Sequence, residues 1–220
     1  MSILTLASIF CAVPALIVLF FGRFENSRPA VRDISILVIS FLLIDILCMI
    51  LAKAAVNNLP FFHLVTALEL FIFGKIFWQN CSGLKKKIIQ FTTFVGLGLL
   101  VINIFCLETL LEFNSVARSV QAIVLLFFAV IWFIEVFQNM KQEKLSNDPI
   151  LYVTTGVLLY FTGNAVIFGL YTELLESHVT FLKSLWDVHS LLNIVLNLLL
   201  AIALFKMQDK PKEIVVTTKA

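Results

Sequence analysis

The sequence predicts an all-α membrane protein, a bundle of seven transmembrane helices, and three observations support this. The chain of 220 residues is 60% apolar and 14% charged, with a mean hydropathy of +1.02. Soluble domains are about half apolar and about a quarter charged. Seven apolar stretches each approach the ~20 residues that span a bilayer as a helix. Basic residues are concentrated in alternate links between these stretches, a pattern typical of membrane proteins.

Each predicted helix is an apolar stretch bounded by short polar or basic links. The first is expected to remain as a helix, because no basic segment precedes it and no signal-peptide cleavage site precedes Arg23. Pro60 and Pro149 suit the first turns of the third and sixth helices. We expect a single transmembrane domain over residues 1–206 and a short polar cytoplasmic tail over 207–220. The expected helices span residues 3–21, 34–52, 60–80, 88–107, 116–139, 150–171 and 184–206.

Lys and Arg are divided unequally between the two sides of the predicted membrane. One side holds only Lys53, Arg118 and Lys183. Because basic loops stay in the cytoplasm, the N-terminus is expected outside and the C-terminus inside. The run 85–87 suits anionic lipid headgroups rather than nucleic acid, so the bilayer is the expected partner and nucleic acid is not. The basic side carries Arg23, Arg28, Arg32, Lys85, Lys86, Lys87, Lys141, Lys144, Lys206, Lys210, Lys212 and Lys219.

Ionisable side chains within the predicted helices mark candidate functional positions, because charge inside a bilayer is costly. Glu69 lies near the middle of the third helix, and Asp45 lies outward of the middle of the second. At 100° per residue, His63 and Glu69 share an arc of about 120°. Such polar faces should turn inward, since lipid offers no hydrogen-bond partners. The candidate ligand-binding residues are Asp45, His63, Glu69, Gln121, Tyr160, Asn164, Trp186, Asp187, His189 and Asn193.

We expect these faces to enclose a polar and aromatic cavity in the outer half of the bundle. The third, fifth, sixth and seventh helices would bound it, with Asp45 of the second reaching it. Other amides, such as Asn103 and Asn197, are expected to act as hydrogen-bonding glue between helices. Lys75 and Glu135 are expected to snorkel towards the cytoplasmic boundary. Close helix packing is expected at Gly96, Gly98, Gly156 and Gly163.

Two other functions remain open as alternatives. A proton-coupled transporter could use Glu69 and Asp45 as proton carriers, but no internal repeat is visible and the helices are expected to be unbroken, with Pro14 their single internal proline. An intramembrane metal-dependent hydrolase needs about three converging ligands, but no HxxxH or HExxH pair is present. Its candidate ligands would be His63, His189, Asp187 and Glu69. The four isolated cysteines predict neither a disulfide framework nor a zinc knuckle. No catalytic residue, metal ligand or cofactor is assigned.

Three segments carry a resemblance to a known group: His63-x5-Glu69, Tyr160-x-x-Gly163 and Trp186-x-x-His189-x3-Asn193. Through them the whole chain resembles small, uncharacterised bacterial seven-helix integral membrane proteins. The resemblance implies the fold and a bacterial membrane, and it implies no activity. The chain lacks the paired histidines on the last helix that are typical of ceramidase and progestin-receptor type hydrolases. It also lacks the Pro-Gln signature of sugar transporters built on three-helix repeats.

These observations favour a sensor or receptor of the bacterial inner membrane over an enzyme. The outward polar bias predicts a small-molecule ligand, and the 22 phenylalanines suit a lipid-like one. The chain has no room for a signalling domain, so a separate cytoplasmic partner would receive the signal. Binding is expected to repack the third, sixth and seventh helices.

Overall fold

The computed structural model describes residues 3–24, 29–139, 145–169 and 179–208. Within these ranges it contains helices and no strands, as the sequence predicts. The end of the predicted sixth helix, at residues 170–171, and most of the predicted tail, at residues 209–220, lie outside the described residues. The elements are α1 Ile3–Ile9, α2 Val13–Phe21, α3 Pro29–Lys53, α4 Leu59–Gln79, α5 Gly83–Cys106, α6 Ser115–Asn139, η1 Leu145–Asn147, α7 Pro149–Gly169 and α9 Val179–Met207.

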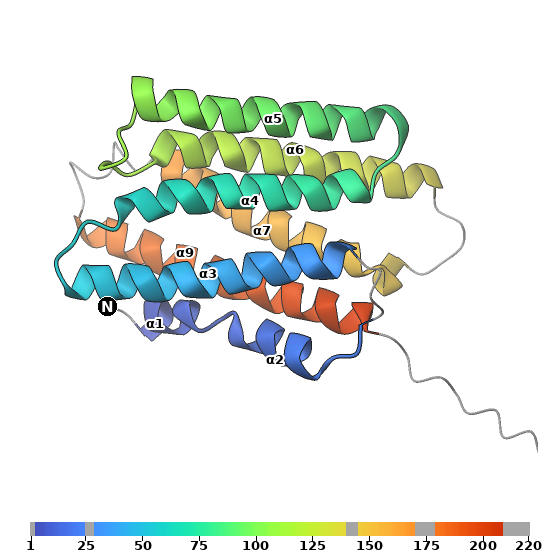
Figure 1. Ribbon diagram of the computed structural model, residues 1–220, viewed down its shortest axis with the longest axis horizontal. Helices are drawn as coiled ribbons and strands as arrows, with labels where there is room; N and C mark the ends of the chain where they lie inside the picture. Colours follow the sequence, from blue (N-terminus) through green and yellow to red (C-terminus); the bar gives the residue numbers. More distant parts are fainter. Residues whose placement is uncertain (1–2, 25–28, 140–144, 170–178, 209–220) are drawn as a thin grey trace, which may run out of the picture.

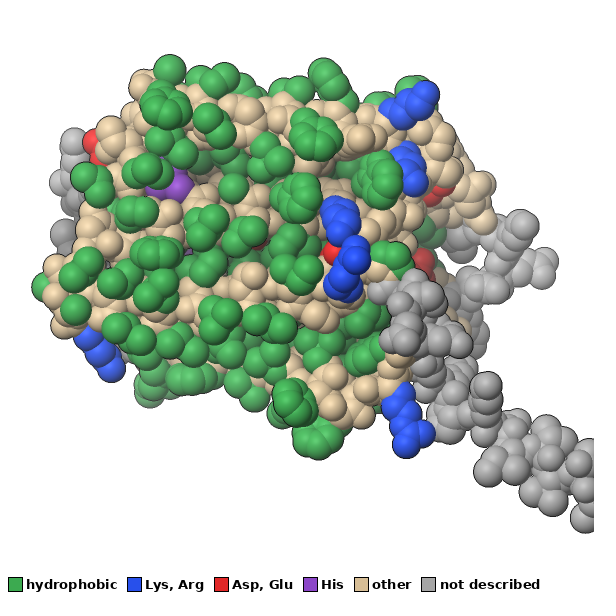
Figure 2. All heavy atoms as spheres, in the orientation of Figure 1, with side chains coloured by type: hydrophobic (Ala, Val, Ile, Leu, Met, Phe, Trp, Pro, Cys, Tyr) green, Lys and Arg blue, Asp and Glu red, His purple; other side chains and the backbone are tan. Residues whose placement is uncertain are grey.

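Seven helical stretches are long and apolar enough to cross a membrane, with α1 and α2 together forming the first. Hydrophobic side chains cover much of the visible lateral surface, and Lys and Arg lie mostly towards one end (Figure 2). The molecule is therefore suited to be a multi-pass membrane protein. Several helices begin earlier than predicted, α3 at Pro29 and α5 at Gly83. Their polar first turns continue the helix because intrahelical hydrogen bonds satisfy the backbone on either side of the membrane boundary.

The seven membrane-length stretches run in alternate directions, with α1 and α2 together as the first, so α1 begins at one end of the bundle and α9 finishes at the other (Figure 1). We call these the N-end and the C-end. The starts of α4, α6 and α9 lie at the N-end, and the starts of α3, α5 and α7 lie at the C-end. α7 packs against α6 and α9, and α4 packs against α3, α5 and α6. α4, α6 and α7 bury the largest shares of their spans, so they form the centre of the bundle.

The first transmembrane stretch is broken, contrary to the expectation of continuous helices. α1 ends at Ile9, and α2 begins at Val13 with Pro14 in its first turn. Pro14 has no N–H to donate, and the backbone between the two helices forms tighter bonds to the third preceding residue, including Val13 N to Phe10 O at 3.1 Å. The prediction of an unbroken first helix was therefore wrong. The break brings the Cys11 thiol to 3.9 Å from the Asn193 carbonyl oxygen of α9.

Three of the four glycines expected at close helix contacts are found there. A Cβ at Gly163 of α7 would overlap Leu192 of α9, and one at Gly156 would lie 2.9 Å from Leu196. Gly96 of α5 would similarly meet Leu70 of α4. Around Gly98 nothing lies within 4 Å, so the prediction was wrong for that residue.

Two ion pairs join neighbouring helices near the C-end. Lys75 Nζ of α4 lies 2.7 Å from Asp33 Oδ1 of α3, and Asp33 is only 2% exposed. Lys85 Nζ of α5 lies 2.7 Å from Glu135 Oε2 of α6. Snorkelling alone therefore does not explain the positions of Lys75 and Glu135, because each side chain also forms an ion pair with a residue of a neighbouring helix.

Glu108, in the connection between α5 and α6, organises the start of α6. Its carboxylate accepts hydrogen bonds from the backbone N–H of Val116 at 2.8 Å, from Ser115 Oγ at 2.7 Å and from Asn103 Nδ2 at 2.9 Å. Partial burial raises the pKa of Glu108, but these bonds and one from the Ala117 N–H together outweigh it and hold the pKa below its ordinary value. Asn103 is thus tied to a loop carboxylate rather than acting as glue between helices.

Candidate functional site

Arg118 lies at the centre of the most polar part of the bundle. It occupies the first turn of α6 and is only 6% exposed. Its guanidinium carbon lies 5.1 Å from the centre of the Phe168 ring and 5.9 Å from that of Phe62, within reach of cation–π attraction. Counting Arg118 among the loop charges was therefore wrong. Its spacing of three residues from Gln121 was the signal, since this spacing places both side chains on one face of a helix.

Two carboxylates from neighbouring helices oppose this single guanidinium. Glu69 of α4 is 1% exposed and accepts a hydrogen bond of 2.7 Å from Gln121 Nε2 of α6. Asp45 of α3 and Glu69 both interact electrostatically with Arg118 and with each other. With all three ionised, this group would carry one net negative charge in a setting where unbalanced charge is costly. One proton would neutralise the group, and a further anion would be unfavourable there.

Tyr160 and His189 extend the polar group across α7 to α9. The Tyr160 side chain is 4% exposed and lies within electrostatic range of Arg118. Its ring lies 5.8 Å from the His189 ring, centre to centre. His189 Nδ1 lies 2.7 Å from Asn164 Oδ1 of α7. With the amide oxygen accepting, Nδ1 carries the hydrogen, and Nε2 of the neutral ring is left as an acceptor.

Four aromatic rings, which we call the aromatic cluster, lie beside this polar group towards the N-end. The Phe113 ring centre lies 6.2 Å from Phe62, 5.7 Å from Phe168 and 5.7 Å from Trp186. The His189 ring is 5.7 Å from Phe168 and 5.4 Å from Trp186. The cluster therefore gives the polar group an apolar border. Sequence reasoning found only Trp186 of these four, because a chain with 22 phenylalanines offers no signal that singles out three of them.

Two buried hydrogen-bond donors in this region have no partner among the described residues. They are Nε of Arg118 and Nδ2 of Asn164, which is 1% exposed. The Phe168 ring lies 5.1 Å from the Arg118 guanidinium carbon and 5.7 Å from the ring of His189, which is the hydrogen-bond partner of Asn164. An unpartnered donor is costly in an apolar setting and marks a place where an oxygen atom from water or a ligand would be favourable.

The structure brings most of the predicted site residues together. Glu69 is hydrogen-bonded to Gln121, Asp45 lies within electrostatic range of Glu69 and Arg118, and the Tyr160 ring lies beside His189. Asp187 follows Trp186 on α9 and is half-buried. The residues placed in or beside the group are Asp45, Glu69, Gln121, Tyr160, Asn164, Trp186 and His189.

His63 and Asn193 have other surroundings. His63 Nε2 lies 3.2 Å from the backbone oxygen of Glu112. With Thr66 and Leu100 it lines a separate cavity of about 130 Å³ between α4 and α5. Asn193 Oδ1 accepts a hydrogen bond of 3.1 Å from Asn197 Nδ2 on its own helix, and its backbone oxygen faces Cys11. The arc shared by His63 and Glu69 is wide enough for the two side chains to face different neighbours.

Within the described residues, no three His, Cys, Asp or Glu side chains come together in a way that could hold a metal ion. His63 and His189 in particular have different partners on different helices. The described residues therefore offer no set of metal ligands for the hydrolase alternative.

No protein-family model, curated protein or solved structure matches this chain. The resemblance to small bacterial seven-helix proteins accordingly stays an expectation from the sequence.

Proposed function

We propose that this protein is a receptor-like sensor of the bacterial inner membrane, with its N-terminus outside and its C-terminus in the cytoplasm. Its ligand is a small amphipathic molecule, lipid-like, with an oxygen acceptor at one end of an apolar body. It binds in the outer half of the bundle, between Arg118 and the aromatic cluster. A separate cytoplasmic protein receives the signal.

The observation that carries this proposal is the pair of unpartnered donors, Arg118 Nε and Asn164 Nδ2, beside Phe168. A ligand oxygen would satisfy these donors, and the aromatic rings would cover the apolar body. Ligand sites commonly combine an apolar lining with a few convergent polar groups. The one-charge imbalance around Arg118 favours a neutral acceptor, or a carboxylate that arrives with a proton.

The charge distribution supports the orientation. At the C-end the described residues include five basic side chains that begin, end or follow helices: Arg23, Arg32, Lys86, Lys87 and Lys206. Lys53 ends α3 at the N-end. An excess of basic residues on one side is the usual mark of the cytoplasmic side, so the Arg118 site would lie nearer the outside.

We expect α3 and α4 to transmit a structural change from the ligand site to the surface at the C-end. Asp45 of α3 and Glu69 of α4 lie within electrostatic range of each other and of Arg118 of α6, and nearer the C-end α3 and α4 are joined by the ion pair of Asp33 and Lys75. A ligand oxygen that competes for Arg118 weakens the first junction and leaves the second in place. The helices would then pivot about the Asp33–Lys75 pair and change the surface at the C-end.

A proton-coupled transporter is the second candidate, favoured by the break between α1 and α2. Discontinuous helices often mark the substrate site of transporters. Cys11, within this break, interacts electrostatically with Asp45, so the broken segment adjoins the carboxylates that would carry the proton.

Three probes with the same C18 chain test the proposed ligand class: monoolein, oleate and oleylamine. The readout is Trp186 fluorescence in a Trp78→Phe/Trp132→Phe background, in detergent. Monoolein and oleate should shift the emission at saturable concentrations, and oleylamine, which has no acceptor oxygen, should not. The response should disappear in the charge-balanced variant Arg118→Gln/Glu69→Gln. Equal responses to all three probes, or no response to any, would overturn the proposal.

Flux separates the two candidates. The protein is reconstituted in liposomes containing a pH-sensitive dye, and monoolein or oleate is added in the presence of a proton gradient. A sensor gives no protein-dependent proton movement. Movement that is lost in Asp45→Asn and unchanged in Lys53→Gln would favour transport instead.

A further inference from the structure

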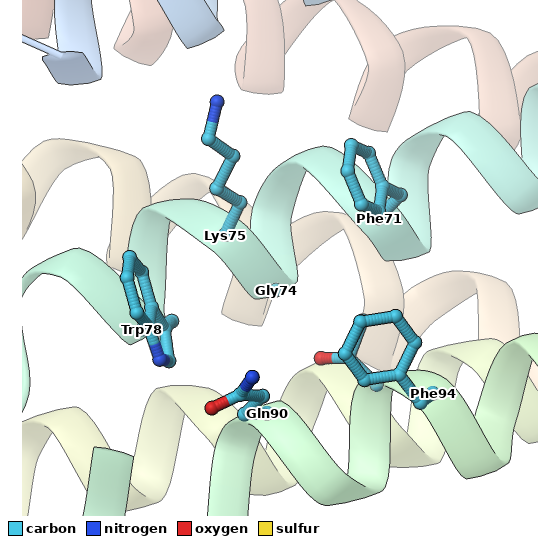
Figure 3. A pocket seen from close by; sticks show the side chains of 7 residues that line it. Phe71, Gly74, Lys75, Trp78, Gln90 and Phe94 are labelled. Carbon is cyan, nitrogen blue, oxygen red and sulfur yellow. The ribbon is translucent and has the colours of Figure 1, made fainter. Parts of the chain in front are cut away.

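We propose that a lateral groove between α4 and α5 binds an anionic phospholipid, with one acyl chain in the groove and the phosphate at Lys86. This inference does not depend on the proposed sensor function, because it concerns a different surface nearer the C-end. The groove has a volume of about 180 Å³ and opens on the lateral surface (Figure 3).

The groove is apolar because of how its walls are built. Phe71 of α4 and Phe94 of α5 face each other across one end, and Gly74 lies between them and Trp78 (Figure 3). Thr93 Oγ1 donates to the backbone oxygen of Ile89 at 2.8 Å, so its hydroxyl is already satisfied. Phe71 and Phe94 are 46% and 61% exposed, which leaves the groove accessible to hydrocarbon from the bilayer.

The cationic end of the groove is provided by Lys86 and not by Lys75. Lys75 lines the groove with its stem, but its side chain points away from α5 (Figure 3) and its ammonium is paired with Asp33. Lys86 Nζ lies 4.0 Å from the centre of the Trp78 ring. Among the described side chains, no carboxylate lies within ion-pair distance of Lys86. Its charge is thus positioned at the end of the groove and available to a phosphate.

A second hollow beyond Trp78 provides room for the headgroup. It has a volume of about 430 Å³ and is lined by Lys86, Asn80 and Asp148, among others. Asp148 is the opposing charge there, and its Oδ1 accepts a hydrogen bond of 2.8 Å from the Ile150 N–H at the start of α7. Most of the lining of the hollow is apolar, but its polar share is larger than that of the groove on the other side of Trp78.

This division matches the chemistry of a phospholipid. From Phe71 to Trp78 the helix rises about 10 Å, enough for the upper part of an acyl chain. Tryptophan is typical of the membrane interface, where headgroups begin. Anionic headgroups attract basic residues next to the membrane by about 1 kcal/mol per charge. The groove, the interfacial Trp78 and the available ammonium of Lys86 follow one another in the order that the lipid requires.

The test uses delipidated full-length protein in detergent and native mass spectrometry. Phosphatidylglycerol and phosphatidylcholine with identical chains are titrated separately. Wild-type protein should retain phosphatidylglycerol about fivefold more strongly, which is the effect expected of one well-placed lysine. Lys86→Glu should abolish the preference. Lys87→Glu is the matched control, because it makes the same charge change one residue away at an exposed position outside the groove.

A second variant tests the groove itself. Gln90 is exposed and lines the groove, so Gln90→Trp should fold and fill it. This change should weaken retention of both lipids. The proposal is overturned if wild-type protein retains the two lipids equally, if Lys86→Glu and Lys87→Glu have the same effect, or if Gln90→Trp retains both lipids at the wild-type level.

Discussion

Arg118 is the only cation among the described residues of the polar group, which also contains two carboxylates and a tyrosine. It therefore sets the net charge of this group. Arg118 forms no ion pair within 4.0 Å of Glu69 or Asp45, but its charge compensates theirs at longer range, so its removal should cost somewhat less than the about 3–5 kcal/mol typical of breaking a buried ion pair in soluble proteins. We therefore expect Arg118→Gln to lower the free energy of unfolding strongly, and Arg118→Gln/Glu69→Gln to lower it less. The measurement is denaturant unfolding of the purified protein in detergent, for the two single variants and the double variant.

The comparison works because the two residues share partners on facing helices, so their effects should not add. The glutamine that replaces Glu69 in the double variant can still accept a hydrogen bond from Gln121, whose amide donates to the native carboxylate. A double variant that is as unstable as the sum of both single variants would show that Arg118 and Glu69 stabilise the bundle independently.

The same residues show what sequence reasoning can and cannot find. The inward orientation of Glu69, Gln121 and Asn164 was predictable from the sequence. A polar side chain far from the ends of an apolar membrane helix almost always faces the interior of the bundle. Arg118 was missed because an arginine near a helix end is usually able to reach water along its long stem. Here the aromatic rings of Phe62 and Phe168 cover it instead, and that depends on how helices are arranged around one another.

Among the elements, the contact between α7 and α9 depends most directly on small residues. A Cβ at Gly163 would overlap Leu192, so Gly163→Ala should separate the helices and lower the thermal unfolding temperature in detergent. Gly163→Ala/Leu192→Ala should recover part of the loss, because the second change removes the overlapping side chain. Gly98→Ala is the control: it adds the same methyl group where nothing lies within 4 Å and should not destabilise. Equal losses at Gly163 and Gly98 would contradict this account.

The start of α6 should respond to pH through Glu108. A carboxyl group whose pKa is lowered by folding stabilises the folded state above its unfolded pKa, and this contribution is lost as the pH falls through the folded pKa. Glu108→Gln should therefore cost about 1 kcal/mol at neutral pH, as loss of a helix cap does. The difference from wild type should shrink below about pH 4.

Unfolding measured from pH 3 to pH 7 checks this prediction. Glu112→Gln is the control, because the carboxylate of Glu112 accepts one backbone hydrogen bond in the loop, from Thr109, whereas Glu108 has four donors. A difference between Glu108→Gln and wild type that stays constant over the whole range would assign its effect to packing rather than to charge.

The seven transmembrane spans were easier to predict from the sequence than the break within the first of them. The seven spans were predictable because each must supply about 20 apolar residues. The break after Ile9 was missed, although Pro14 lies inside the predicted first helix, where a proline removes a backbone hydrogen bond and often kinks or breaks the helix. Here the shortened hydrogen-bond pattern before Pro14 and the contact between Cys11 and Asn193 fix a bend, and both depend on the neighbouring α9.

At the scale of the whole molecule, orientation decides which compartment supplies the ligand. The N-end carries Lys53, and the C-end carries Arg23. The basic excess at the C-end predicts that this end is cytoplasmic, so the aromatic cluster would face the outside. Single reporter cysteines can test this if the native thiols stay silent. Cys106 is exposed and needs replacement by serine, whereas the other three cysteines are buried.

Cys81, in the link between α4 and α5, illustrates why the buried thiols should not interfere. Burial, reinforced by the nearby Glu135 carboxylate and opposed by Lys85, raises the pKa of the Cys81 thiol to about 11, so little reactive thiolate forms at pH 7. In a Cys106→Ser background, Lys53→Cys should react with a membrane-impermeant maleimide in intact cells. Arg23→Cys should react only after the membrane is permeabilised. The reverse pattern would place the Arg118 site nearer the cytoplasm, and the ligand would then have to be an intracellular or inner-leaflet molecule.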